Sequence, residues 1–354
     1  MTRRLDPTAP VDVLTQQLCD IESVSGNERE IADEIEAVLR DVPHLVVDRD
    51  GDAVIARTML GRDRRVLIAG HTDTVPIKDN LPVRREGGRL IGRGTADMKG
   101  GVAVQLALAA QLAEPVVDVT WIFYDHEEVG AELNGLGRVA ARRPELLAGD
   151  FAVLCEPTNA QVEGGCNGTA RITLRFDGVR AHSARPWKGR NAIHAMAPSL
   201  ATLAGYVPDE IEVEGLVYRE SLSAVGIGGG VAGNVVPDHA ELSINYRFAP
   251  SRTGEQAIAR LRELFGDGEL IVEDLAEGAR PGLDDPLAQD FVAAVRAEVS
   301  PKYGWTDVAR FSALGIPAVN YGPGDPMRAH TDDEFVPIAD LLACEAGLRT
   351  WLTR

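Results

Sequence analysis

Histidine and acidic side chains recur in five short polar segments of this sequence, at residues 70–76, 92–101, 124–128, 155–158 and 329–334. Together these segments offer imidazole nitrogens and carboxylate oxygens, which are ligands that zinc accepts. One such segment alone carries little information, because acidic residues are common on the surface of a chain in which 25% of the residues are charged. All five, taken in this order, predict a metal centre.

Short apolar runs lie directly before three of these polar segments, at residues 66–70, 119–124 and 151–155. Helical patterns at residues 101–112 and about 132–142 separate the runs. Strands that are buried on both faces and alternate with helices indicate a largely parallel sheet. Ligands bind at the carboxyl ends of the strands in such sheets, so we expect the polar segments to meet there.

The pattern changes after about Gly164. Residues 170–176 and 240–246 alternate apolar and polar side chains, which is typical of half-buried antiparallel strands. Helical patterns follow at residues 191–203 and 254–264. This part of the chain therefore predicts a small α+β domain with an antiparallel sheet and two helices.

The α/β pattern returns near Pro281, with an expected strand at residues 316–321 and a closing helix at 338–351. We therefore expect a discontinuous α/β domain whose mostly parallel sheet is flanked by helices and carries the metal centre. It would comprise residues 1–166 and 280–354, with residues 167–279 forming an inserted α+β domain.

Composition narrows the possible partners and compartment. The 354 residues include 36 basic and 54 acidic side chains, for a formal charge of −18, so the chain lacks the basic surface that nucleic-acid binding needs. The most apolar helical stretch, residues 101–113, is too short to span a membrane. No apolar run follows the basic N-terminal residues, and the four cysteines are scattered. We expect a cytoplasmic protein with reduced thiols and neither nucleic acid nor membrane as a partner.

The most specific motifs are GHTDTVP at residues 70–76 and GRGTADMKGG at 92–101. With the other ligand segments they resemble the zinc-dependent aminoacylase, carboxypeptidase G and desuccinylase family of co-catalytic metallohydrolases. The resemblance extends over nearly the whole chain and implies a zinc-exopeptidase-like catalytic, metal-binding domain at residues 1–166 and 280–354. It also implies that the inserted domain at residues 167–279 is a lid and dimerisation domain. Residues 124–129, 134–138 and 304–311 are similar to the desuccinylases, in particular to their shorter actinobacterial form.

The resemblance implies a set of metal ligands. His71 with Glu156 would hold one ion, Glu128 with His330 would hold the other, and Asp97 would bridge the two. The expected cofactor is two Zn²⁺ per subunit, for which Co²⁺ can substitute. The family also carries a cis peptide bond after the bridging aspartate, which here would join Asp97 to Met98.

The same resemblance implies three catalytic roles. Asp73 would accept the second N–H of His71 and so fix its tautomer. Glu127 would be the general base that takes a proton from water. His182 would stabilise the oxyanion in the active site of a partner subunit. The exposed edge strand of an inserted antiparallel sheet would pair with its copy, so we expect a homodimer.

Substrate contacts are implied mainly for Asn234 and for Arg247, whose guanidinium fork suits a carboxylate. Further expected contacts are Thr169, Thr306 and Arg310. The longer desuccinylases carry arginines where this chain has Cys-Asn-Gly at residues 166–168, so the acyl carboxylate would be held differently, with Arg310 as one candidate.

The activity that the resemblance implies is hydrolysis of N-succinyl-L,L-2,6-diaminopimelate to succinate and L,L-2,6-diaminopimelate, in lysine and cell-wall diaminopimelate biosynthesis. Two divalent ions roughly 3.5–4 Å apart can activate a water and polarise the amide carbonyl for this reaction. Other hypotheses are another deacylase of small anionic acyl-amino acids, such as acetylornithine deacetylase, a metal-dependent dipeptidase or carboxypeptidase, or a metal-binding protein without activity. The glycine run at residues 228–233 fits a dinucleotide motif, but a strand and turn follow it rather than a helix, which argues against an oxidoreductase.

Overall fold

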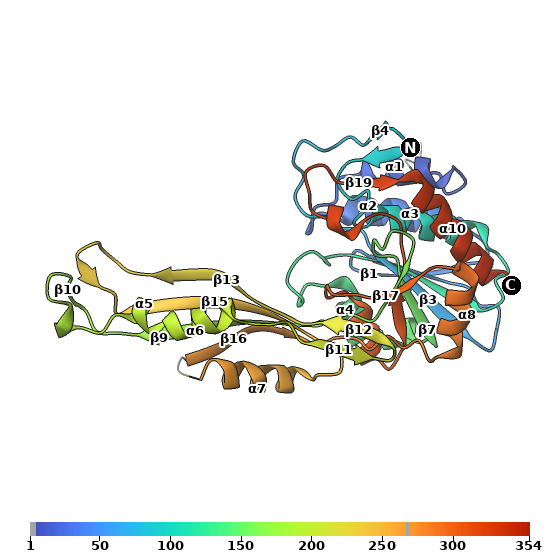
Figure 1. Ribbon diagram of the computed structural model, residues 1–354. Coiled ribbons are helices and arrows are strands. Elements are labelled where there is room, and N and C mark those ends of the chain that lie inside the picture. Colours follow the sequence, from blue (N-terminus) through green and yellow to red (C-terminus); the bar gives the residue numbers. More distant parts are fainter. Residues whose placement is uncertain (1–4, 267–268) are drawn as a thin grey trace. The chain divides into compact units, whose positions relative to one another are not determined.

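The computed structural model describes residues 5–266 and 269–354, which form two compact units (Figure 1). The first unit comprises Met1–Gly164, Pro281–Ser300 and Arg310–Arg354, and the second comprises Gly165–Arg280 and Pro301–Ala309. The expected inserted domain, 167–279, differs from the second unit by two residues at its start and one at its end. The segment 301–309 was expected in the catalytic domain, but its contacts place it in the second unit.

The first unit is built on an eight-stranded mixed sheet with the strand order β1-β2-β6-β3-β7-β18-β8-β17. The strands are β1 (Val46–Asp50), β2 (Ala53–Arg57), β3 (Arg65–His71), β6 (Asp118–Tyr124), β7 (Phe151–Leu154), β8 (Val162–Gly164), β17 (Val299–Pro301) and β18 (Ala318–Asn320). Strand β3 pairs in parallel with both β6 and β7, and β7 pairs in parallel with β18. These central strands are almost entirely buried, as continuous apolar runs require, and the expected mostly parallel sheet is confirmed.

Helices cover the sheet of the first unit (Figure 1). They are α1 (Val11–Cys19), α2 (Arg29–Arg40), α3 (Lys99–Gln111), α4 (Gly135–Arg142), α8 (Pro286–Val295) and α10 (Ile338–Leu352). Helix α9 (Val308–Ala313) begins at the end of the second unit and continues into the first. Helix α3 packs against β3, α1 and α10 and is buried on nearly every side, because its sequence is apolar all round. Helix α4 begins later than expected because the Asn134 side chain caps it by accepting a hydrogen bond from the Gly137 N–H.

A small three-stranded sheet in the first unit has the order β19-β5-β4. It consists of β4 (Arg84–Glu86), β5 (Arg89–Ile91) and β19 (Phe335–Pro337). Phe335 of β19 lies opposite Ile91 of β5 in an antiparallel pair. This pairing brings the polar segment at 329–334 beside the segment that begins at Gly92.

The second unit contains a four-stranded antiparallel sheet with the order β13-β15-β9-β16. The strands are β9 (Gly168–Asp177), β13 (Ser221–Gly229), β15 (His239–Phe248) and β16 (Glu269–Ala276). Helices α5 (Ala192–Ala195), α6 (Ala197–Ala204) and α7 (Gly254–Leu264) accompany the sheet (Figure 1). Alternate residues of β15 are buried, and α5 and α7 share one apolar core with β9 and β15, which confirms the expected α+β arrangement.

Two further observations concern expectations from composition. Within residues 5–266 and 269–354, no helix combines the length and the apolar character that crossing a membrane requires. The four cysteines, at positions 19, 155, 166 and 344, are buried and form no disulfide. Burial raises the pKa of the Cys155 thiol to about 12, so this side chain stays protonated and packs as an apolar group.

Candidate metal centre

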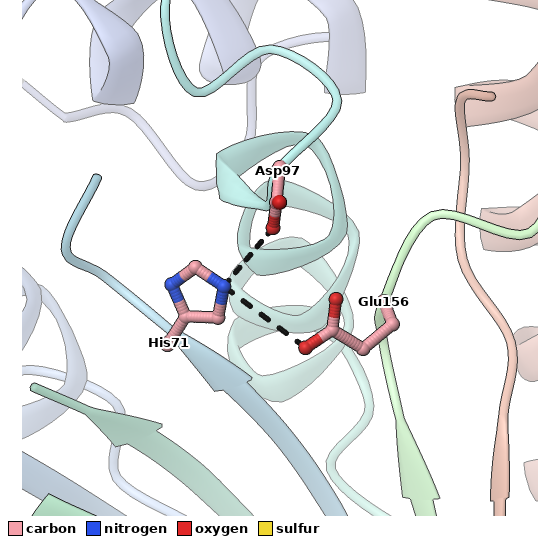
Figure 2. Close-up of side chains that lie close together, drawn as sticks. All are labelled: His71, Asp97 and Glu156. Atoms are coloured by element: carbon pink, nitrogen blue, oxygen red, sulfur yellow. Dashed lines mark hydrogen bonds and ion pairs between the residues drawn. The ribbon is translucent and has the colours of Figure 1, made fainter. Parts of the chain in front are cut away.

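His71, Asp97 and Glu156 lie together at the carboxyl edge of the parallel strands (Figure 2). His71 is the last residue of β3, Asp97 lies just before α3, and Glu156 follows β7. His71 Nε2 is 3.1 Å from Asp97 Oδ1 and 4.0 Å from Glu156 Oε1. The His71 side chain is only 1% exposed, so these acceptors compete little with water. The peptide bond between Asp97 and Met98 is cis, as the family resemblance implies.

A second group forms around the other oxygen of Asp97. Asp97 Oδ2 is 3.3 Å from His330 Nε2, and that nitrogen is 2.9 Å from Glu128 Oε2. The two carboxylate oxygens of Asp97 therefore face two different imidazoles, His71 on one side and His330 on the other. Glu128 follows β6 by a few residues, whereas His330 comes from the segment before β19.

These distances fit two cations that share one carboxylate. In each group the candidate ligand atoms lie within 4.8 Å of one another. The donors are imidazole nitrogens and carboxylate oxygens, without a thiolate, which suits Zn²⁺ and other divalent first-row metals. All five residues that the family resemblance assigns as metal ligands belong to these two groups.

The adjacent residues Glu127 and Glu128 have different surroundings. Both have a carboxylate oxygen within 4.8 Å of a His71 nitrogen and of each other. Glu128 alone also belongs to the group that contains Asp97 and His330. Glu127 therefore borders the centre, while Glu128 lies within it.

Asp73 organises the turn that carries both glutamates. Its Oδ1 accepts the Glu127 N–H at 3.0 Å, and its Oδ2 accepts the Glu128 N–H at 3.1 Å and the Ser25 hydroxyl at 2.7 Å. His71 Nδ1 lies 3.0 Å from the backbone carbonyl of Asp73 and 3.4 Å from Oδ1, so the nearest acceptor for this nitrogen is the carbonyl. Burial opposes ionisation of Asp73, but the adjacent His71 imidazole and hydrogen bonds from Glu127 and Ser25 outweigh it and hold the pKa at about 2.

The crowding of carboxylates strongly affects the two imidazoles. Burial alone would lower the pKa of His71, but hydrogen bonds to Asp73 and Asp97 outweigh burial and raise it well above its usual value. Hydrogen bonds to Asp97 and Glu128 raise the pKa of His330 to about 10. Without metal, these raised pKa values favour protonated imidazoles, which offset part of the negative charge of the carboxylates.

Glu28 is a buried acidic residue that sequence reasoning missed. Its side chain is fully buried, and its Oε1 accepts the backbone N–H groups of Gly26 and His126. His126 has a φ of +58°, and its ring contacts both Glu28 and Asp125. Glu28 therefore helps to hold the turn before Glu127, and only a tertiary contact across 98 residues reveals it.

The expected substrate residues of the second unit fall into two separate places. Thr169 and Arg247 lie directly opposite each other on β9 and β15. The Thr306 carbonyl lies 3.7 Å from Cys166 Sγ, just before β9 begins. Arg247 is half-buried and donates a hydrogen bond to Asn245.

Strand β10 (Ala181–His182) lies beyond the other end of β9 (Figure 1), and it carries His182. His182 ends β10 (Ala181–His182), which pairs with β14 (Val235–Val236), and the Asn234 carbonyl accepts the Ser183 N–H. Both residues are exposed. Thr169 and Asp177 are eight residues apart on β9, or about 26 Å, so His182 is far from Thr169 within one chain.

Arg310, the remaining expected substrate contact, lies in α9 and belongs to the first unit. Its guanidinium lies against Gly137 of α4, where a Cβ atom would approach Nη1 to 2.7 Å. A glycine at position 137 therefore leaves the space that this arginine occupies.

Comparison with known proteins places these observations in a family. The pattern of peptidase family M20/M25/M40 matches residues 67–354. A Mycobacterium tuberculosis protein provisionally named succinyl-diaminopimelate desuccinylase DapE is 52% identical over 342 residues, covering 96% of this chain and 97% of that protein. The succinyl-diaminopimelate desuccinylase of Corynebacterium glutamicum is 49% identical over 352 residues, covering 96% of this chain and 95% of that enzyme.

The fold is also found among solved structures. The aminopeptidase PepT from Bacillus cereus superposes with a TM-score of 0.80 over 99% of this chain and 98% of its own, at 19% sequence identity. At that identity the likeness concerns the fold. The match over most of the chain and the near-full-length relatives show that this chain belongs to peptidase family M20/M25/M40 and is a hydrolase of amide bonds.

Proposed function

We propose that this chain is a succinyl-diaminopimelate desuccinylase, which hydrolyses N-succinyl-L,L-2,6-diaminopimelate to succinate and L,L-2,6-diaminopimelate. The names of the two relatives at 52% and 49% identity support the choice of substrate. The observation that carries the metal-dependent reaction is Asp97, whose two oxygens face His71 and His330 at 3.1 and 3.3 Å. This is the arrangement that a bridging carboxylate requires.

The proposed cofactor is a pair of Zn²⁺ ions, for which Co²⁺ can substitute. His71 and Glu156 would hold one ion, Glu128 and His330 the other, and Asp97 both. When bound, two such ions polarise the amide carbonyl and make water a better nucleophile. Glu127 and Asp73 do not belong to this ligand set. Glu127 is available to transfer protons, and Asp73 is available to orient its neighbours.

Glu127 is the proposed general base. Its carboxylate lies within 4.8 Å of His71 and Glu128, so it borders the place where water and substrate would meet. It would accept a proton from water and return that proton to the leaving amine. Asp73 would keep Glu127 in place, because it accepts the Glu127 backbone N–H.

The proposed assembly is a homodimer formed through the second unit. Strand β13 is an edge of its sheet, and its side chains Val225 and Ile227 are 59% and 66% exposed. Leu200 of α6 adds further exposed apolar surface. A second copy of the chain would cover this edge and its apolar side chains with the same surface on its own second unit.

The dimer also accounts for the separation of the expected substrate residues. His182 and Asn234 lie about 26 Å or more along β9 from Thr169 and Arg247, which is too far for one small substrate to contact both within a chain. We propose that His182 completes the site of the partner subunit, where it donates to the developing oxyanion. The proposed compartment is the cytoplasm.

A comparison of substrates tests this function. Metal-stripped protein, reconstituted with Zn²⁺, would be assayed with N-succinyl-L,L-2,6-diaminopimelate, N-acetylornithine and dipeptides. The proposal expects the highest kcat/KM for the succinyl substrate. A higher kcat/KM for either other class would reassign the substrate while leaving the metal centre intact.

A further inference from the structure

Arg93 and Glu334 form a buried ion pair beside the metal centre. Arg93 Nη1 lies 2.7 Å from Glu334 Oε2, and the two side chains are 4% and 0% exposed. A fully buried carboxylate is expensive to maintain unless its oxygens are well paired. None of the roles described above uses this pair.

The second oxygen of Glu334 is bonded to the backbone that carries Asp97. Glu334 Oε1 accepts the N–H of Ala96 at 3.0 Å and the N–H of Asp97 itself at 3.1 Å. The Glu334 backbone carbonyl also accepts the Gly92 N–H at 2.9 Å. Glu334 thus bonds to both ends of the segment 92–97, at Gly92 and at the ligand Asp97.

Glu334 is also close in sequence to another ligand, since it lies four residues after His330. Directly after it, Phe335 of β19 pairs with Ile91 of β5. Two segments that are far apart in the sequence are therefore joined at two points, by the strand pairing and by the Glu334 side chain. Asp97 Oδ2 and His330 Nε2, which these segments carry, lie 3.3 Å apart.

We propose that Glu334 is a positioning residue for the metal centre: through Arg93 and the backbone N–H groups of Ala96 and Asp97, it fixes the bridging carboxylate relative to His330. The proposal rests on the proposed function, because it takes Asp97 and His330 as metal ligands. Partners that orient metal ligands typically contribute 10- to 100-fold to metal affinity. Glu334 acts on the backbone of its ligand rather than on the ligand atoms.

The substitution Glu334→Gln tests this role with little change in volume. An amide keeps one oxygen, which can accept from the Asp97 N–H or face Arg93, but its NH₂ group must then oppose the other donor. We expect Zn²⁺ affinity at the pair of sites to fall about 10- to 100-fold, measured by titration against a competing chelator. The number of Co²⁺ ions bound and their absorption spectrum give a second readout that does not depend on turnover.

The matched control is Glu220→Gln in the second unit. Glu220 is also 0% exposed, pairs with Arg252 at 2.7 Å and accepts a backbone N–H from Ala249 at 2.9 Å. The Glu220→Gln substitution should lower the Tm about as much as Glu334→Gln does and leave both metal ions bound with wild-type affinity. A fall in metal affinity in this control equal to that of Glu334→Gln would show that lost stability, and not positioning, weakens the centre.

The double variant Arg93→Met/Glu334→Leu separates stability from positioning further. Replacing both charges with apolar groups avoids an unpaired buried charge, so the Tm should be higher than that of Glu334→Gln but below that of wild type, because two backbone N–H groups lose their acceptor. Metal affinity should stay low, because no acceptor remains for the Ala96 and Asp97 N–H groups. Recovery of wild-type metal affinity together with the Tm would overturn the proposal.

The wild-type titration distinguishes failure of this inference from failure of the proposed function. If the wild-type chain binds fewer than two ions, the proposed dinuclear centre is wrong. If the wild-type chain binds two and Glu334→Gln binds two with equal affinity, the centre stands and the positioning role of Glu334 is wrong.

Discussion

Replacing Asp73 with asparagine should affect both stability and turnover. Asp73 is fully buried and accepts three hydrogen bonds, from the N–H groups of Glu127 and Glu128 and from the Ser25 hydroxyl. An asparagine keeps one acceptor oxygen, but an NH₂ group replaces the other oxygen and would face a hydrogen-bond donor. The Asp73→Asn variant therefore loses at least one hydrogen bond to a charged group, which costs about 1.5–3 kcal/mol.

The lowered pKa of Asp73 gives a separate magnitude, which includes the attraction of His71 as well as the hydrogen bonds. In the metal-free protein this pKa is about 2, compared with 3.8 for a free carboxyl. The difference corresponds to about 2 kcal/mol of stability at neutral pH. Because the folded pKa is the lower one, this stability is complete above pH 3.8 and is lost as the pH falls through about 2. Urea unfolding of metal-free wild-type and variant protein at neutral pH measures it.

Asp118 provides a matched control for Asp73. It is also buried, and it accepts the N–H groups of Leu60 and Arg62 and the Thr58 hydroxyl, at 2.9, 3.0 and 2.8 Å. Asp118→Asn should lower the free energy of unfolding by a similar amount, about 2 kcal/mol, without changing kcat. Asp73→Asn should lower kcat as well, because the Glu127 turn loses its anchor. Equal kcat values in wild type and Asp73→Asn would refute this role, and an unchanged free energy of unfolding would refute the energetic reasoning.

Three further outcomes follow from the site. Glu127→Gln should keep two metal ions and lower kcat about 10²- to 10⁴-fold, as loss of a general base does. Glu128→Gln should lose metal, and metal analysis that shows the reverse pattern would exchange the roles of the two residues. Metal uptake at neutral pH should release about two protons, because the raised pKa values of His71 and His330 keep both imidazoles protonated in the metal-free protein. Calorimetry in two buffers measures the number of protons released, and release of none would contradict this expectation. A mixture of His182→Ala and Glu127→Gln subunits should recover roughly a quarter of wild-type activity after random exchange, since half the dimers then contain one complete site. Subunit exchange without recovery of activity would exclude action of His182 across the interface.

The strands that position the centre could be predicted because their burial is a local property of the sequence. The runs that form β3, β6 and β7 are apolar throughout, and each ends beside a polar segment, so His71 and Glu156 could be placed at one edge of a sheet. The family resemblance then supplied the ligand set. The structure adds that the two oxygens of Asp97 face different imidazoles, His71 and His330.

Other features depend on contacts that no local pattern encodes. Glu28 and Glu334 are acidic residues to which the sequence gives no individual role, yet both are buried and bonded to partners that lie 98 and 241 residues away. Residues 301–309 have neither helical nor alternating periodicity, so their place in the second unit could not be predicted. Glu127 and Glu128 are chemically identical neighbours, and only their different distances from Asp97 and His330 separate them.

The number of metal ions bound by the wild-type chain and by Asp97→Asn tests the central claim most directly. Asp97 directs its two oxygens to His71 and His330, so a single carboxylate would serve both ions. Native mass spectrometry of metal-stripped protein titrated with Zn²⁺ should show two ions per wild-type chain, and weakened binding of both ions to Asp97→Asn. One ion per wild-type chain, or two ions bound equally well by Asp97→Asn, would contradict the bridged centre.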